Sequence, residues 1–177
     1  MATNKYINLK KALNAYGKYV VQQSRSNLTK LKKGDGPLYN SISYELDSEK
    51  GIFLLEFLME DYGEFQDKGV RGAGGTRKTT SQFNRKNNKG KIWKQKGGKS
   101  PYSFKEGRKP SVKHFKKWSE SRGLNAYAIR ESVFRQGLKP SFFFSKPFNK
   151  GIDKYADEIF NGFVLDVENK ILFGESK

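Results

Sequence analysis

The 177-residue chain has no cysteine and only one histidine, His114. Without cysteine it cannot form disulfide bonds, thiolate metal sites or a cysteine nucleophile. A zinc site of the usual histidine and cysteine type is excluded, and serine–histidine catalysis would depend on His114 alone, with no nucleophile-elbow glycines around any serine. His114 stands beside Phe115 in a segment with a helical pattern. We therefore interpret it as a structural residue.

Long apolar runs are also missing from the chain. No stretch approaches the roughly 20 apolar residues that span a bilayer, and the N-terminal sequence MATNKYINLKK lacks the apolar centre of a signal peptide. The sequence thus predicts a soluble protein made in a cytoplasm, with no membrane partner. Its aromatic content of 14% predicts a folded core rather than full disorder.

Acidic residues are scarce between Arg71 and Pro110. This segment holds thirteen Lys and Arg against a single acid, Glu106, a net charge of +12. The remaining 137 residues hold 22 basic and 17 acidic residues, a net charge of +5. The segment is also rich in glycine, so it cannot bury a core of its own. We predict a basic arm that contacts nucleic acid, a neighbouring subunit or an acidic protein, rather than charge that only aids solubility.

The residues expected to make these contacts are the basic side chains of the arm and one tryptophan: Arg71, Arg77, Lys78, Arg85, Lys86, Lys89, Lys91, Trp93, Lys94, Lys96, Lys99, Lys105, Arg108 and Lys109. Lysine and arginine interleaved with aromatic rings can combine phosphate contacts with base stacking. The same residues can equally dock on an acidic protein surface.

The first part of the chain predicts a helix followed by a hairpin. Apolar residues recur every three or four positions over 6–33, which is typical of an amphipathic helix. Residues 38–47 alternate in polarity, and a polar turn joins them to 52–59. The second strand is nearly all apolar, which predicts that both of its faces are covered. Residues 61–69 suggest a bend leading into a short extended piece.

The part after the arm predicts two short helices, a strand and a long helix. Ser111 and Asn125 are suitable N-caps for helices that end near Gly123 and Gly137. Residues 141–144 predict a short strand, and the last helix begins at Ser145. We expect some apolar surface of the long first and last helices to be buried against other subunits.

These elements define the expected fold class and domain organisation. The order of elements predicts an α+β fold with a mainly antiparallel sheet, flanked by long N- and C-terminal helices and carrying a long basic loop insertion. We expect a single domain over residues 1–177, with the arm inserted at 71–110.

Three patterns in the sequence bear on chemistry or specific recognition. An acidic cluster could hold Mg²⁺ in a nuclease, but its spacing is loose and favours a solvated strand end; it comprises Glu56, Glu60, Asp61, Glu64 and Asp67, with Lys68 beside them. The glycine-rich stretch 72–80 lacks the spacing of a phosphate-binding loop. The helices of 111–137 imitate a helix-turn-helix, but their basic residues lie mainly on the first helix rather than the second. We predict no catalytic residue, metal or cofactor.

The chain outside the arm resembles the neck and tail-completion proteins of long-tailed bacteriophages. The resemblance rests on segments in a fixed order: Ser26-Asn27-Leu28, Gly36-Pro37-Leu38-Tyr39-Asn40-Ser41-Ile42, Tyr62-Gly63-Glu64-Phe65-Gln66-Asp67-Lys68-Gly69, Trp118-Ser119-Glu120-Ser121-Arg122-Gly123-Leu124, Ala126-Tyr127-Ala128-Ile129-Arg130 and Gly137-Leu138-Lys139-Pro140-Ser141-Phe142-Phe143-Phe144. The lysine- and glycine-rich arm is not part of the family's minimal pattern.

This resemblance implies a non-enzymatic structural protein of the virion, assembled in the host cytoplasm. Such a protein forms a homo-oligomeric ring, a hexamer or dodecamer, at the joint between head and tail. It contacts the adjacent connector and tail-tube proteins and surrounds a channel for DNA. Two alternatives stay open from the residues themselves: a nonspecific nucleic-acid-binding accessory protein, and a metal-dependent nuclease.

Overall fold

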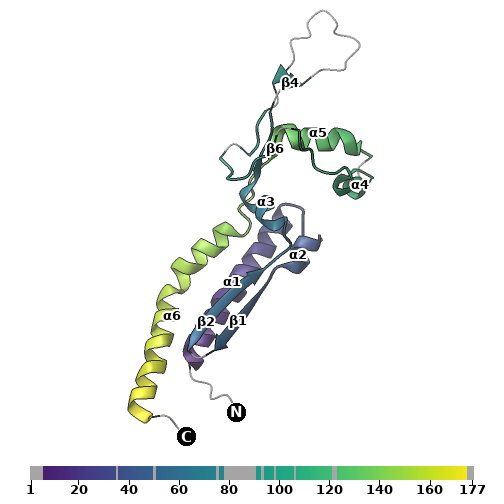
Figure 1. The fold of residues 1–177 in the computed structure, drawn as a ribbon. Coiled ribbons are helices and arrows are strands. Elements are labelled where there is room, and N and C mark those ends of the chain that lie inside the picture. Colours follow the sequence, from purple (N-terminus) through teal and green to yellow (C-terminus); the bar gives the residue numbers. More distant parts are fainter. Residues whose placement is uncertain are drawn as a thin grey trace, which may run out of the picture. The chain divides into compact units, whose positions relative to one another are not determined.

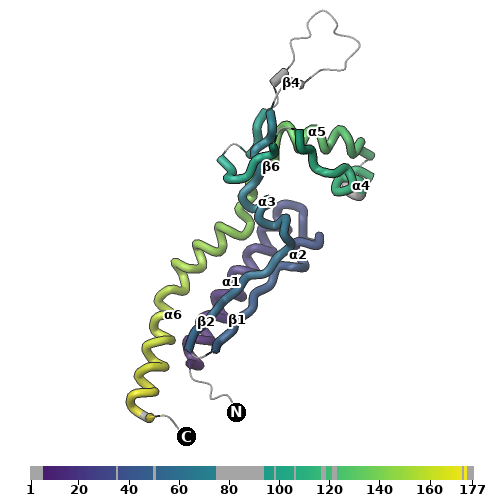
Figure 2. The backbone as a smooth tube through the Cα atoms, viewed as in Figure 1, coloured from purple at the N-terminus to yellow at the C-terminus, as the bar shows by residue number. Residues whose placement is uncertain are grey.

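The computed structural model describes residues 6–34, 36–49, 51–74, 76–77, 91–92, 94–97, 99–105, 107–120 and 123–174. The chain divides into two compact units. Unit 1 comprises Met1–Gly63 and Phe143–Lys177, and unit 2 comprises Glu64–Phe142. Figures 1 and 2 trace the chain through both units. Each unit is described here by itself.

Two long antiparallel helices form the frame of unit 1. Helix α1 (Ile7–Lys30) lies beside α6 (Ser145–Phe173), and a hairpin of β1 (Ser43–Glu49) and β2 (Ile52–Leu58) lies along α1 (Figure 1). The short helix α2 (Pro37–Ser41) leads into the hairpin. The predicted hairpin and the long N- and C-terminal helices are confirmed, and so is the α+β fold class. The first strand was predicted over 38–47, however, and its first residues are instead helical in α2, which follows Gly36 with Pro37 in its first turn.

The hairpin is a two-stranded antiparallel ribbon with one exposed face. Its register runs from Ser43 opposite Leu58 to Glu49 opposite Ile52. Exposure alternates along both strands, and Ile52 is 73% exposed. The prediction that both faces of 52–59 are covered is therefore wrong. The reason is that only one face of the ribbon packs on α1, while alternate side chains of a strand point to opposite faces.

Aromatic rings fill the space between α1, α6 and β2. Tyr16 on α1 lies 5.9 Å from the ring of Phe57 and 6.1 Å from that of Phe148, measured between centroids. Its hydroxyl donates to the Phe148 carbonyl at 3.3 Å, and burial raises the pKa of Tyr16 to about 12. Edge-on and tilted ring pairs of this kind add to the energy of apolar burial. They fix α6 against α1.

A carboxylate of α6 caps the first turn of α1. Tyr6, which precedes the helix, makes no side-chain cap. Instead one oxygen of Asp166 accepts from the Asn8 backbone N–H at 3.2 Å and from Asn8 Nδ2 at 2.9 Å, and the other accepts from the Leu9 N–H at 2.8 Å. The negative charge also faces the positive end of the helix dipole. A cap supplied 158 residues away along the chain leaves no local sequence signal.

We expect Asp166→Ala to lower the free energy of unfolding by about 1–2 kcal/mol, the usual cost of losing a helix cap. Chemical denaturation followed by circular dichroism measures it. The matched control is Asp157→Ala, an exposed carboxylate on the same helix, which should change stability by no more than about 0.5 kcal/mol. Equal effects of the two substitutions would contradict the capping role.

Unit 2 is built from short elements. Helix α3 (Gly63–Lys68) begins in the last residue of unit 1 and leads to β3 (Val70–Arg71), which pairs with β6 (Gly137–Leu138); β4 (Thr76–Arg77) pairs with β5 (Lys91–Ile92). Helices α4 (Lys113–Glu120) and α5 (Ala126–Gln136) pack on each other. All three ladders found among the described residues are antiparallel and two-stranded.

The caps predicted for α5 are confirmed, but two nearby predictions are wrong. Asn125 accepts from the backbone N–H groups of Tyr127 and Ala128, and Gly137 ends the helix with φ 81°. Residues 61–69, however, contain helix α3 rather than a bend, although the short extended piece predicted to follow is present as β3. The predicted strand 141–144 is also not formed.

Local interactions explain both differences. Lys68 pairs with Glu64 one helical turn earlier, at 2.7 Å, which supports α3. In the second segment, the backbone N–H groups of Ser141 and Phe142 both donate to the Asp67 carbonyl, and Phe142 is left-handed with φ 51°. A strand cannot continue through that conformation. Within the described residues, no helix is long and apolar enough to cross a membrane.

Candidate interaction surfaces

The positive charge of the protein is concentrated in unit 2. Residues 64–142 hold 21 Lys and Arg against five acidic residues, a net charge of +16. The rest of the chain holds 14 basic and 13 acidic residues, a net charge of +1. The asymmetry thus extends beyond the predicted arm into the helices that follow it.

The structure describes about half of the predicted contact residues with their side chains. Those seven are exposed: Arg71, Lys94, Lys96, Lys99, Lys105, Arg108 and Lys109. Arg77 and Lys91 are opposite each other in the β4–β5 ladder. The other five lie outside the described residues: Lys78, Arg85, Lys86, Lys89 and Trp93. Contact of any of them with DNA or protein stays a prediction.

The second half of the predicted arm is folded into unit 2. The backbone of Lys96 donates to Gln136 at 2.8 Å, and Phe104 donates to Arg71 at 2.9 Å. The Phe104 ring lies 5.9 Å from that of Phe134, which is buried. Ser100, also buried, donates its hydroxyl to the Gly69 carbonyl at 2.6 Å. The exposed lysines of residues 94–105 are therefore presented on a folded surface.

Glycines in this unit serve close backbone packing rather than phosphate binding. A Cβ on Gly72 would collide with the Arg135 carbonyl, and one on Gly97 or Gly137 would collide with the Val70 carbonyl. The N–H of Gly72 is taken by the Gln95 side chain at 3.1 Å. The next two N–H groups donate to carbonyls at the end of α5. These amides are used inside the unit, so they offer no cradle for a phosphate.

A carboxylate joins the end of the arm to α5. Glu131 accepts from Lys109 at 2.7 Å and from Arg135 at 3.0 Å. The hydrogen bond from Lys109, and after it that from Arg135, lowers the pKa of Glu131 below its ordinary value. The Lys109 ammonium also lies 5.7 Å from the centre of the Phe134 ring. Lys109 is therefore a structural residue as well as a predicted contact residue.

We expect Glu131→Gln to lower the free energy of unfolding by about 0.5–1 kcal/mol near neutral pH, a value discounted for the partial exposure of the group. Because the folded pKa is lowered, the contribution is complete above the unfolded pKa and disappears as the pH falls through the folded pKa. The difference between wild type and variant should therefore shrink and disappear as the pH falls through the lowered pKa of Glu131. Denaturation at several pH values checks this, and a pH-independent difference would contradict it.

The acidic residues of the candidate nuclease site lie in different environments in the structure. Glu64 pairs with Lys68 on α3; the hydrogen bond from Lys68, with a further one from Tyr102, lowers the pKa of Glu64. Asp67 is only 3% exposed, and Glu56 faces solvent on β2. In the part of the chain that the structure describes, no three His, Asp or Glu side chains are grouped so that they could hold a metal ion. His114 is exposed on α4.

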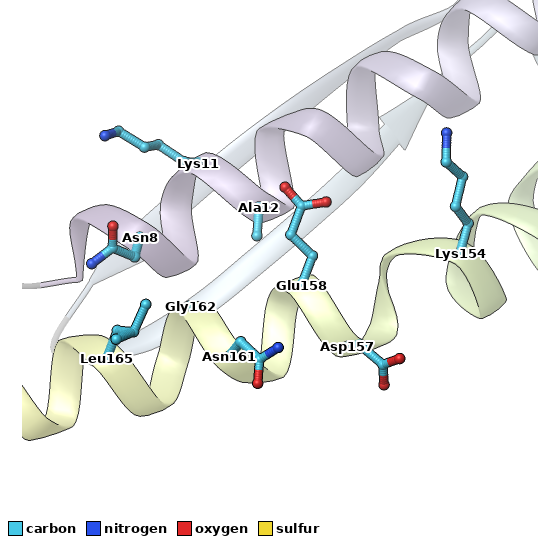
Figure 3. A pocket seen from close by; sticks show the side chains of 9 residues that line it. All are labelled: Asn8, Lys11, Ala12, Lys154, Asp157, Glu158, Asn161, Gly162 and Leu165. Carbon is cyan, nitrogen blue, oxygen red and sulfur yellow. The ribbon is translucent and has the colours of Figure 1, made fainter.

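A groove of about 520 Å³ lies between α1 and α6 (Figure 3). Two lysines and two carboxylates line it, Lys11, Lys154, Asp157 and Glu158, together with two asparagines, Ala12, Gly162 and Leu165. Its charges balance, so it does not select a ligand of either sign. The two helices are in close contact at the bottom of the groove. There Gly162 of α6 lies against the Asn8 backbone, and a Cβ on Gly162 would come within 3.0 Å of the Asn8 carbonyl.

One side of α6 exposes large apolar side chains. Ile152, Phe160, Phe163 and Ile171 are 45%, 66%, 45% and 75% exposed. At 3.6 residues per turn, these four positions lie within an arc of about 100°. The helix thus has an inner and an outer apolar face. One packs on α1, and the other, here called the α6 stripe, is open to solvent.

Comparison with known proteins finds no match. No family model fits the chain, and neither a curated protein nor a solved structure matches it. The functional proposal therefore depends on the residues and surfaces described above.

Proposed function

We propose that this chain is a non-enzymatic structural protein of a long-tailed bacteriophage, which assembles into a ring at the head–tail joint or the end of the tail. The ordered segments that resemble neck and tail-completion proteins support the viral part of the proposal. In this role the chain contacts copies of itself, the connector and the tail-tube proteins. No cofactor is required.

The observation that carries the assembly part is the α6 stripe. Four large apolar side chains on one side of a 29-residue helix are open to solvent in the single chain. Monomeric soluble proteins rarely expose an extended apolar surface, and such a surface commonly marks a protein interface. Burial of apolar area supplies most of the free energy of association. The exposed stripe is most simply explained if the protein functions in an assembly in which these side chains are buried.

The cationic unit is compatible with a role in a DNA-packed particle. A ring protein lies beside the DNA channel and between other virion proteins. A unit with a net charge of +16 can contact either an acidic neighbour or the DNA backbone. The proposal places this unit at one of these contacts and assigns no chemistry to it.

The test is the mass of the purified chain by light scattering, with electron microscopy of the same sample. We expect closed rings free of nucleic acid, formed by the chain alone or on addition of connector and tail-tube proteins. A chain that stays monomeric under both conditions would contradict the proposal. The absorbance ratio at 260 and 280 nm is the standard check for bound nucleic acid.

The second candidate is a nonspecific nucleic-acid-binding accessory protein. The excess of 21 basic over five acidic residues in unit 2 favours it. It predicts binding that weakens steeply as salt rises, because each neutralised phosphate releases counterions. A monomer that carries nucleic acid at low salt and releases it at high salt would favour this candidate over the ring.

A further inference from the structure

The exposed face of the hairpin combines an acidic row with an apolar row. The outward side chains of β1 include Glu45, Asp47 and Glu49, and those of β2 include Ile52, Leu54 and Leu58. We call these six residues and Glu56 the hairpin outer face. In the ribbon register, Ile52 lies opposite Glu49 and Leu54 opposite Asp47. The two rows therefore form one continuous surface.

The apolar row is more exposed than the fold of the hairpin requires. Ile52, Leu54 and Leu58 are 73%, 51% and 41% exposed, while their neighbours along the strand face α1. Polar residues at these outward positions would keep the same ribbon, as they do on β1. The row is free to contribute binding energy by burial against another molecule.

The acidic row selects the charge of that molecule. Glu45 of β1 lies directly opposite Glu56 of β2, and like charges at opposite positions of a ribbon repel each other. Among the described residues, no lysine or arginine forms an ion pair with these two side chains or with Asp47 or Glu49. A cationic group placed over the face would relieve the repulsion. A nucleic acid would be repelled.

The same chain carries a surface of the required sign. Unit 2 has a net charge of +16, and Lys94, Lys96 and Lys99 are exposed on its folded part. We infer that the hairpin outer face of one copy binds the cationic surface of unit 2 in a second copy. This inference rests on the self-assembly proposed above, and it assigns the two surfaces that meet.

A contact between two different surfaces has a consequence for assembly. Each copy has one acidic apolar face and one cationic face, so every bound copy leaves one of each free. Such head-to-tail contacts grow into a closed ring if the rotation between copies closes, and into a filament if it does not. Charge complementarity sets the orientation of the copies, and the apolar row contributes affinity.

The test uses three full-length variants, each with three charges reversed. The hairpin variant is Glu45→Lys, Asp47→Lys and Glu49→Lys. The lysine variant is Lys94→Glu, Lys96→Glu and Lys99→Glu. The control is Glu60→Lys, Asp61→Lys and Glu158→Lys, three exposed carboxylates outside the hairpin outer face and the α6 stripe, whose reversal changes the net charge as much as in the hairpin variant. Circular dichroism verifies that each variant is folded.

Light scattering over a concentration series gives the result. We expect the hairpin and lysine variants each to need at least about a 10-fold higher concentration than wild type to associate. The control should associate like wild type. A mixture of the hairpin and lysine variants should again form complexes, because the intact hairpin face of one meets the intact lysine surface of the other.

Other outcomes overturn the inference. They are a wild-type chain that does not associate, a hairpin variant that associates like wild type, or a mixture that stays monomeric. A hairpin variant that self-associates normally but no longer binds a cationic tail protein would assign the face to that protein instead. If the mixed hairpin and lysine variants form complexes but electron micrographs show no closed rings, the proposed ring function is rejected and this contact is supported. If the hairpin variant alone forms closed rings, the contact is rejected and the ring function is supported.

Discussion

Phe143→Ala is expected to lower the free energy of unfolding by about 3–5 kcal/mol, the range for removing a buried phenylalanine side chain. Phe143 is fully buried where the chain re-enters unit 1, and it packs in one cluster with Leu28, Leu38 and Ile42. Its carbonyl accepts from Asn27 Nδ2 at 3.1 Å, which ties the backbone to α1. The substitution leaves a cavity among close-packed neighbours on α1 and α2, which can fill it only in part by local shifts.

The matched control is Phe160→Ala on α6. The same atoms are removed, but Phe160 is 66% exposed, so we expect a change within about 0.5 kcal/mol. Both values come from denaturant unfolding at a protein concentration low enough to keep the chain monomeric. Equal losses for the two variants would mean that the core of unit 1 is not centred on Phe143. A large loss for Phe160→Ala that appears only at high concentration would instead report association through the α6 stripe.

Gly97→Ala is expected to lower the free energy of unfolding by about 2–3 kcal/mol, the cost of forcing an extra methyl group into a packed site. A Cβ at this position would collide with the Val70 carbonyl and come within 2.8 Å of the Leu138 carbonyl. Those two residues face each other in the β3–β6 ladder. Backbone cannot move aside as a flexible side chain does, so the ladder itself must shift.

Gly36→Ala is the control for this substitution. At Gly36 the nearest atom to an added Cβ is 4.0 Å away, and φ is −89°, which alanine adopts without strain. Alanine is less favourable than glycine at the N-cap of α2, but it also lowers the entropy of the unfolded chain, so we expect a net change within about 0.5 kcal/mol. Thermal or denaturant unfolding compares the two. If Gly97→Ala were as mild as Gly36→Ala, residues 94–105 would be loosely attached to unit 2.

Several elements could be predicted from the sequence because their signals are local. The apolar period over 6–33 predicted α1, and the polar turn between two strand-like runs predicted the hairpin. Asn125 and Gly137 marked the ends of α5 because capping and left-handed backbone depend on the residue itself. The charge of 71–110 could be counted directly. The arm's folded half could not be predicted, because its contacts to Gly69 and Phe134 come from residues 30 or more positions away.

The prediction for β2 shows how burial differs from hydrophobicity. Its run of seven apolar residues in eight was consistent with a strand covered on both faces, and only the structure shows that Ile52, Leu54 and Leu58 face solvent. A signal was present in the partner strand, because the alternation of Glu45, Asp47 and Glu49 already indicated a solvent-facing row. In a two-stranded ribbon the same face of both strands is open, so this row predicts exposure across the hairpin.

The sequence by itself determined α1, α4, α5 and α6, the hairpin, the absence of thiol chemistry and the excess of positive charge. These follow from residue type and from spacing within one element. Tertiary structure alone decided which apolar residues are buried, that Asp166 caps α1, and that glycines of unit 2 lie against neighbouring backbone. The physical reason is that burial, capping across the fold and close backbone contact depend on which distant segments meet. The same tertiary contacts leave the hairpin outer face and the α6 stripe exposed to solvent.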